Sequence, residues 1–427
     1  RRGQLHQMRD QAGAARAVAR WSEVAADAKA AAVLLDRAFA GFAAARPGPC
    51  VMHVPISALG ETAGPLPPPS AVPARPAADP AIVEEVAARI RAAERPLFVF
   101  GGGAARSGAT ASARRVLALA GAAAFTTYAG RGVVAPDWPL LFGSFLARPD
   151  SSAVVASADL VVAVGTELSE VDLWRPQLGH ACPLVRVDLD PEVLADDHRA
   201  DLPVLADAAG FLAALEAALS GNRPATGWRP AEVAEARARW RAQADAERPG
   251  ILPVIDALRA AVPSAATIFS DMTQFAYLAK EVWDMPAPGR WHHPFGFGTL
   301  GYALPAAIGG KIGLGAQPVV AIAGDHGLQY TLPELAVAVE RGLSLPIIVW
   351  DNGKLKEIED CMIDAQMSPR ATTARNPDFL ALARAYGARA AEPKGAAGIR
   401  AAMAEALAAP VPTLIRLTPE SLGGAPG

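Results

Sequence analysis

The segment VVAIAGDHGLQYTLPELAVAVERGLSLPIIVWDNGK, residues 319–354, carries the strongest evidence for the fold class of this chain. One apolar run ends at Gly-Asp (Asp325), a helix-like pattern follows, and a second apolar run ends at Asp-Asn (Asn352). Within the helical pattern, Thr331 and Glu334 have the spacing of a capping box, which predicts a helix start there. Strand, helix and strand in this order predict a right-handed parallel crossover.

Short apolar runs separated by helical patterns recur along the chain. The clearest of them cover residues 96–100, 159–165, 183–190, 265–271, 346–352 and 412–417. Runs that are apolar on both faces favour buried parallel strands covered by helices. We therefore predict an α/β protein with doubly wound parallel sheets in consecutive domains.

Two stretches divide the chain into domains. Residues 60–80 are dense in Pro, which disfavours both helix and central strand and predicts a linker. Residues 220–250 open with turn residues and continue as a charged helical pattern, which indicates a surface connector. The expected organisation, in chain order, is an N-terminal segment over residues 1–60, a linker 61–80, a central Rossmann-like domain 81–220, a second linker 221–250 and a C-terminal domain 251–427.

Composition and charge exclude several classes of protein. Hydrophobic residues make up 52% of the 427 residues, which excludes a disordered chain, and a formal net charge of −3 gives no electrostatic basis for binding nucleic acid. The three cysteines have no paired spacing, which argues against a disulfide framework or zinc site and favours a reducing cytoplasm. No apolar stretch reaches the roughly 18 to 20 residues of a membrane helix.

The first residues, RRGQLHQMRDQ, include neither an initiator Met nor the apolar core of a signal peptide. We therefore expect that the chain begins inside a larger protein.

Asp325 and Asn352 follow two strands that the crossover places in one sheet, so we expect them to lie close together. A carboxylate, an amide oxygen and a nearby backbone carbonyl are ligands that Mg²⁺ or Ca²⁺ prefers. Gly327 leaves the loop backbone open, and N–H groups there form a nest for a phosphate. The alternative is that both side chains only form turns by bonding their own backbone.

A second candidate is the sequence GGGAARSG, residues 101–108, which follows a strand and precedes a helix. Such a turn binds a nucleotide phosphate in some proteins and serves packing alone in others. A nicotinamide-dependent oxidoreductase would use this turn, but the chain has no clear acidic ribose ligand at the expected distance.

Four ordered motifs resemble thiamine-diphosphate-dependent enzymes. GDHG…DNG, with 352 − 325 = 27 positions from acid to amide, resembles the Gly-Asp-Gly…Asn-Asn signature of that family. FGFGTLGYALPAAIGGKIG (295–313) and SDMTQFAY (270–277) resemble its cofactor-binding segments. GQLHQMRDQAGAARAVARWSEVA with RPGPCVMHVP resembles the end of its first, pyrimidine-binding domain, so residues 1–60 would be a remnant of that domain and 251–427 the diphosphate-binding domain.

The resemblance implies the site residues and cofactors. Asp325 and Asn352 would bind Mg²⁺ with their side chains and Lys354 with its carbonyl, while Leu300 would take the place of the bulky residue that bends thiamine diphosphate. The full implied cofactor-binding set is Thr273, Gln274, Gly298, Thr299, Leu300, Gly324, Asp325, His326, Gly327, Asn352, Lys354 and Leu355. The central domain binds FAD in some relatives and nothing in others, and FAD is the less favoured expectation here.

The resemblance is strongest to the acetolactate-synthase-like branch, in particular its 2-oxo-acid decarboxylases. It implies decarboxylation of a 2-oxo acid, with or without carboligation, in a homodimer or homotetramer whose active site lies between subunits. The alternative is a non-catalytic paralogue that keeps the scaffold and binds a partner.

The chain departs from the family pattern at three positions. His326 replaces the closing Gly and would be solvated at a loop apex or narrow the site. Asp351 replaces the first Asn, and we expect it to bind a backbone amide; Lys356 replaces a small residue. The family's activating Glu would lie upstream of Arg1, so no catalytic residue is named.

The predicted helix that starts near Leu355 bears on the substrate. Glu357, Asp360 and Asp364 share one helical face and would present carboxylates to a cationic tail. A guanidinium pairs with carboxylates bidentately, which would favour an arginine-derived 2-oxo acid over pyruvate. The alternative is a solvated, charged helix face.

Overall fold

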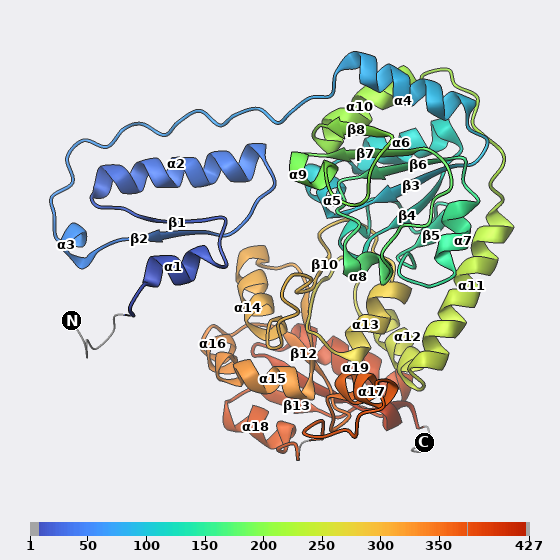
Figure 1. Ribbon diagram of the computed structural model, residues 1–427. Helices are drawn as coiled ribbons and strands as arrows, with labels where there is room; N and C mark the ends of the chain where they lie inside the picture. The colour runs from blue at the N-terminus through green and yellow to red at the C-terminus, as the bar shows by residue number, and fades with distance from the viewer. Residues whose placement is uncertain (1–7, 374, 424–427) are drawn as a thin grey trace.

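The computed structural model describes residues 8–373 and 375–423, which form three parallel sheets in chain order (Figure 1). The first is a two-stranded sheet of β1 (Trp21–Val24) and β2 (Cys50–His53). Its helices are α1 (Gln11–Arg16), α2 (Ala28–Ala44) and α3 (Ile56–Leu59). The Pro-rich stretch that follows contains no helix or strand before α4 and crosses to the central sheet as an extended segment (Figure 1).

The central sheet has six strands, all paired in parallel, in the order β5-β4-β3-β6-β7-β8. The order reverses between β3 and β6, which is the switch point of a doubly wound fold. The strands are β3 (Pro96–Phe100), β4 (Ala123–Thr126), β5 (Leu141–Gly143), β6 (Leu160–Val164), β7 (Leu184–Asp188) and β8 (Leu202–Leu205). The helices are α4 (Pro80–Ala92), α5 (Gly102–Ser107), α6 (Thr110–Ala120), η1 (Tyr128–Gly130), α7 (Ser151–Ala156), α8 (Glu170–Leu173), α9 (Pro191–Leu194) and α10 (Ala208–Ala218).

The third sheet also has six parallel strands, in the order β10-β9-β11-β12-β14-β13. They are β9 (Thr267–Ser270), β10 (Trp291–His292), β11 (Val319–Gly324), β12 (Pro346–Trp350), β13 (Arg389–Ala391) and β14 (Thr413–Leu417). The helices are α12 (Ile251–Ala261), α13 (Gln274–Val282), α14 (Ala303–Leu314), α15 (Asp325–Thr331), η2 (Leu332–Glu334), α16 (Leu335–Glu340), α17 (Lys356–Asp364), α18 (Phe379–Ala385), α19 (Gly395–Ala408) and η3 (Pro419–Leu422). The predicted doubly wound α/β class is confirmed.

The helix expected to begin at a capping box begins six residues earlier. α15 starts at Asp325 directly after β11, and a 3-10 turn at Pro333 joins it to α16. The hydroxyl of Thr331 donates to the carbonyl of Gly301 at 3.0 Å and forms no cap with Glu334. The capping-box prediction was wrong because a tertiary partner took the hydroxyl.

The segment predicted as a surface connector is a packed helix, α11 (Pro230–Glu247). Trp240 is fully buried, with ring centroids 5.8 Å from those of Phe125 and Phe142, and its Nε1–H donates to Asp150 at 2.6 Å. Four residues on one face are buried, namely Val233, Ala236, Trp240 and Ala244. The charges on the other faces of α11 hid this narrow apolar stripe from the sequence prediction.

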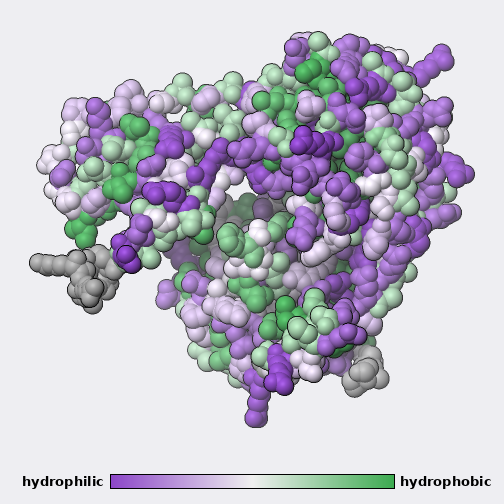
Figure 2. Space-filling view, in the orientation of Figure 1, coloured by the Kyte–Doolittle hydropathy of each residue, from purple (hydrophilic) through white to green (hydrophobic). Residues whose placement is uncertain are grey.

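A continuous hydrophobic core joins the two large sheets through α11, α12 and α13. The first sheet is less covered, since α2 buries only Ala38 and leaves Phe39 exposed. Figure 2 shows that the surface is hollowed between this N-terminal segment and the two large sheets. Among the described residues, no helix is long and apolar enough to cross a membrane. All three cysteines carry free thiols, as their spacing indicated.

Candidate active site

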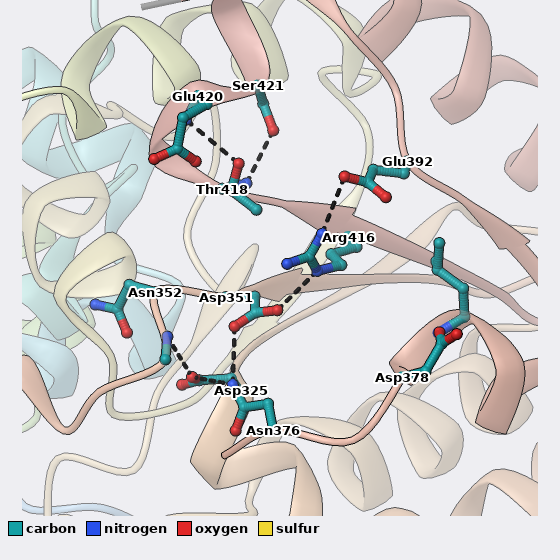
Figure 3. Close-up of polar contacts among 12 residues, drawn as sticks. Asp325, Asp351, Asn352, Asn376, Asp378, Glu392, Arg416, Thr418, Glu420 and Ser421 are labelled. Carbon is teal, nitrogen blue, oxygen red and sulfur yellow. Dashed lines mark hydrogen bonds and ion pairs between the residues drawn. The ribbon is translucent and has the colours of Figure 1, made fainter. Parts of the chain in front are cut away.

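The acid and the amide that follow β11 and β12 meet at the carboxyl edge of the third sheet (Figure 3). Asp325 is 3% exposed, and its Oδ2 accepts the backbone N–H of Gly353 at 2.9 Å. Asn352 lies beside this contact, and its Oδ1 accepts the N–H of Lys354 at 3.2 Å. Asp325 and Asn352 therefore lie close together, as predicted. Asn352 also forms the local turn that the alternative interpretation expected.

Asn376, which no sequence motif marked, bridges two acids at this edge (Figure 3). Its Nδ2 donates to Asp325 Oδ2 at 2.6 Å and to Asp351 Oδ1 at 2.8 Å. The amide group therefore fixes the spacing of two carboxylates that would otherwise repel each other. Nothing local indicates this role, because an Asn-Pro pair predicts only a turn.

Asp351 does not bind a backbone amide as we expected. Its Oδ2 accepts from Arg416 Nε at 2.7 Å, and Arg416 Nη1 donates in turn to Glu392 at 2.9 Å (Figure 3). The prediction was wrong because Arg416, from β14 next to β12, brings a charge to the buried acid. A lone Arg in the otherwise apolar run PTLIRL was the sequence signal for such a partner.

His326 lies in the first turn of α15 and not at a solvated loop apex. Its side chain is only 16% exposed, and its backbone N–H donates to Asp325 Oδ1 at 2.9 Å. The ring Nδ1 lies 3.1 Å from the same oxygen. Because α15 begins earlier than predicted, His326 lies in the helix. Its backbone N–H and its ring contact the carboxylate of Asp325 and hold it in place.

Two glycines allow close packing at this site. A Cβ on Gly327 would lie 2.6 Å from Asp271 Oδ2, and a Cβ on Gly324 would lie 3.1 Å from the side chain of Thr273. Asp271 Oδ2 accepts the N–H of Gly301 at 2.7 Å, and burial raises the pKa of Asp271. Segments 270–277 and 295–313 therefore both reach the end of β11.

The other residues predicted for the cofactor site have contacts of their own. Gly298 has a φ of +64°, and a Cβ at this position would lie 3.1 Å from Met272. Thr299 is exposed and Leu300 is half-buried. Leu355 donates its N–H to Thr372 at 2.7 Å, and Lys354 Nζ lies 3.0 Å from Glu359.

The carboxylates of α17 are paired and do not form a free row. Glu357 Oε1 accepts from Arg248 Nη2 at 2.7 Å, and Glu357 Oε2 accepts from Gln274 Nε2 at 2.9 Å. Asp360 contacts Lys356 and accepts from Gln274 at 3.2 Å. Asp364 is exposed. The row predicted for a cationic tail is thus altered by Arg248, which lies at the end of α11 and distant in sequence.

The donor set at this edge suits a hard cation held with a phosphate. Asp325 offers a carboxylate, Asn352 an amide oxygen and Lys354 a carbonyl, which are oxygen ligands of the kind that Mg²⁺ takes. A Cβ on Gly327 would meet Asp271 Oδ2, so this glycine lets the first turn of α15 lie against the segment from Ser270 to Tyr277. In the portion of the chain that the structure describes, no group of three or more His, Cys, Asp or Glu could hold a metal by itself. An ion here would need further oxygens from phosphate and water.

A separate cavity lies at the carboxyl edge of the central sheet. It has a volume of about 940 Å³ and is lined by the glycine turn, by Phe42 and Arg46 of the N-terminal segment, and by Phe295 of the third domain. A Cβ on Gly101 would lie 2.2 Å from the carbonyl oxygen of Gly165, so that glycine serves backbone packing. We place the candidate active site at Asp325, where the side chains expected to bind the metal lie.

Comparison with known proteins identifies the family. Residues 83–215 match the central domain of thiamine pyrophosphate enzymes, and residues 271–417 match their C-terminal, thiamine-pyrophosphate-binding domain. The chain is 36% identical over 400 residues to the probable 2-ketoarginine decarboxylase AruI of Pseudomonas aeruginosa, covering 92% of this chain and 70% of that protein. It is 26% identical to the acetolactate synthase isozyme 3 large subunit of Escherichia coli, covering 88% and 69%.

The fold agrees with that of a solved relative. The benzoylformate decarboxylase of Polynucleobacter necessarius superposes with a TM-score of 0.77 at 21% identity, covering 94% of this chain and 76% of that one. The chain therefore belongs to the thiamine pyrophosphate enzyme family. Within this family, the chain falls in the acetolactate-synthase-like branch. The alternative of a nicotinamide-dependent oxidoreductase is therefore discarded.

Proposed function

We propose that the protein catalyses decarboxylation of a 2-oxo acid with thiamine diphosphate and Mg²⁺. The observation that carries the proposal is that Asp325, at the end of β11, accepts the backbone N–H of Gly353, which directly follows Asn352 at the end of β12. In the reaction, a 2-oxo acid and a proton become an aldehyde and CO₂. Bound thiamine diphosphate would accept the electron pair of the breaking carbon–carbon bond.

The chain's own residues would hold and orient the cofactor. Asp325, Asn352 and the Lys354 carbonyl would bind Mg²⁺, and the N–H groups near Gly327 would receive phosphate oxygens. Asn376 and His326 keep the Asp325 carboxylate in place. Thr273, Gly298, Thr299 and Leu300 would line the rest of the cofactor site.

For the substrate, we propose an arginine-derived 2-oxo acid as the first candidate. Support comes from the similarity to the probable 2-ketoarginine decarboxylase and from the three carboxylates in the first turns of α17, namely Glu357, Glu359 and Asp360. Arg248 already occupies Glu357 Oε1 and Lys356 pairs with Asp360, so a guanidinium tail would have to displace one of these two cations.

Assembly, carboligation and FAD belong to the same proposal. We infer a homodimer or homotetramer, because the family resemblance places the active site between subunits. We infer a cytoplasmic location from the unpaired spacing of the three cysteines. Carboligation would follow if a second carbonyl compound, in place of a proton, took up the electron pair. The 940 Å³ cavity is where FAD would bind, although the glycine turn beside it is explained by packing.

The test is CO₂ release by the full-length protein with both cofactors. We expect kcat/KM for 5-guanidino-2-oxopentanoate to exceed that for pyruvate, and Glu357→Gln to lower the guanidino value by about tenfold, as loss of a charge-assisted contact predicts. Asp364→Asn, at an exposed position of the same helix, is the control and should change neither value.

Two results would contradict this proposal. Absence of turnover of any 2-oxo acid, with cofactor binding intact, would favour the non-catalytic paralogue. A preference for pyruvate would remove the arginine-derived substrate while leaving the decarboxylase assignment in place.

A further inference from the structure

Buried positive charge gathers where the central sheet meets the third domain. Arg131, Arg148 and Lys280 are 4%, 3% and 5% exposed. Arg148 is balanced, because it pairs with Glu281 and lies 2.7 Å from Glu247. No described carboxylate lies within ion-pair distance of Arg131 or Lys280. Buried charges are ordinarily paired, because an isolated one is costly to remove from water.

Arg131 has an unused donor. Its Nε donates to the carbonyl of Tyr128 at 3.0 Å, Nη1 makes a long contact of 3.4 Å to the carbonyl of Trp283, and Nη2 has no partner among the described residues. The guanidinium lies over the ring of Trp291, 4.5 Å from its centroid. Burial lowers the pKa of Arg131 to about 9, and the carboxyl group of Asp284 offsets part of this effect from beyond ion-pair distance.

Lys280 lies in an aromatic cage beside it. Its Nζ is 4.3 Å from the ring centroid of Tyr128, 5.0 Å from that of Tyr277 and 5.7 Å from that of Phe295. The carboxyl groups of Glu281 and Asp172 attract this ammonium from beyond ion-pair distance, and burial raises the pKa of both acids. Aromatic faces attract the ammonium but accept no conventional hydrogen bond from it.

His293 adds a buried polar atom without a partner. Ser270 Oγ accepts from the indole of Trp291 at 2.7 Å and lies 2.9 Å from His293 Nδ1. The other ring nitrogen, Nε2, is buried and has no partner among the described residues. Burial, together with the charges of Lys280 and Arg131, lowers the pKa of His293 to about 2, so the ring stays neutral.

The side chains of Lys280, Arg131 and His293 all lie near the same two aromatic residues. Tyr128 and Phe295 are stacked with centroids 6.2 Å apart, Lys280 lies over both, His293 is 5.0 Å from Phe295, and Arg131 binds the Tyr128 carbonyl. Phe295 also lines the 940 Å³ cavity, together with Asp172, so a small molecule could arrive from there.

We propose that a small carboxylate-shaped anion binds at this junction, accepting hydrogen bonds from Lys280 Nζ and Arg131 Nη2. A water molecule accepts two hydrogen bonds and carries no charge, whereas a carboxylate offers about four lone-pair positions and neutralises one cation. The site adjoins the segment from His293 to Leu300, so the anion would also fix the approach to the cofactor site. This inference does not depend on the proposed reaction.

The experiment measures acetate binding by the full-length protein without thiamine diphosphate or Mg²⁺. The melting temperature is followed while acetate is titrated, with ionic strength held constant by a bulky sulfonate buffer. We expect a saturable rise, because a ligand that binds only the folded state stabilises it. Bicarbonate should act like acetate, and chloride should act more weakly.

Lys280→Met keeps the volume of the side chain and removes its charge. We expect this variant to melt no lower than wild type without acetate, and to bind acetate roughly tenfold to a hundredfold more weakly. Lys394→Met is the matched control at an exposed position and should keep the full response.

Three outcomes would overturn the proposal. These are a wild-type protein that shows no saturable response, a Lys280→Met variant that responds as wild type does, and a chloride response equal to that of acetate. Because cofactors are absent, failure here would leave the decarboxylase proposal untouched.

Discussion

The central and third sheets share one architecture but differ in what the turn after a strand is for. Gly101 precedes α5 and Gly324 precedes α15, and neither has a positive φ, at −104° and −81°. A Cβ on Gly101 would meet the backbone of Gly165 at 2.2 Å, whereas a Cβ on Gly324 would meet the side chain of Thr273 at 3.1 Å. A glycine turn after a strand therefore does not by itself identify a phosphate site.

The side chains at the strand ends carry the difference. At the edge of the third sheet, Asp325 and Asp351 are held by the amide of Asn376 and balanced by Arg416. At the edge of the central sheet, Asp188 accepts from the N–H of Asp190 at 3.0 Å, and burial raises its pKa. Two similar folds thus differ in chemistry through a few residues that follow their strands.

The strongest test of this comparison removes one acid from each edge. Asp325→Ala should abolish the rise in melting temperature that thiamine diphosphate and Mg²⁺ produce in the full-length protein. It should lower kcat/KM by more than about a hundredfold, since even residues that support metal ligands contribute tenfold to a hundredfold. Asp188→Ala should keep the cofactor-induced rise. Full thiamine diphosphate affinity in Asp325→Ala would remove the metal assignment.

A second test compares the two glycines by stability. Gly101→Ala should lower the free energy of unfolding by about 3 kcal/mol, because the new methyl group meets rigid backbone. Gly324→Ala should cost about 1 kcal/mol, because contacts at 3.1 Å require a shift of only a few tenths of an ångström, but it should weaken thiamine diphosphate binding. Urea unfolding and cofactor titration measure the two effects. Equal stability losses would show that the turns do not differ as the distances indicate.

The smallest expected effect concerns the ion pair of Asp351. Arg416→Met should cost about 1–2 kcal/mol, because it leaves a buried carboxylate with only the Asn376 amide. In the Arg416→Met background, Asp351→Asn should recover part of the lost stability. In wild type, the same substitution should not stabilise the protein. A double-mutant cycle on urea unfolding measures the coupling. Additive effects would mean that Arg416 does not balance Asp351.

Sequence patterns predicted the α/β class, the buried strands and the meeting of Asp325 with Asn352. These predictions rest on local features, namely apolar runs and polar residues directly after them, and on a crossover rule with few exceptions. Predictions that needed a distant partner were less successful. Asp351 was assigned to a backbone amide, α17 to a free carboxylate row, and α11 to the surface.

The order of strands and helices, and the chemistry available at each strand end, can thus be predicted from the sequence alone. Which groups meet at those strand ends depends on the folded chain. Asn376 reaches Asp325 across 51 positions and Arg416 reaches Asp351 across 65. Hydrophobic periodicity depends on near neighbours in the chain, whereas these contacts depend on strand pairing and helix packing, which bring together residues that no local pattern relates.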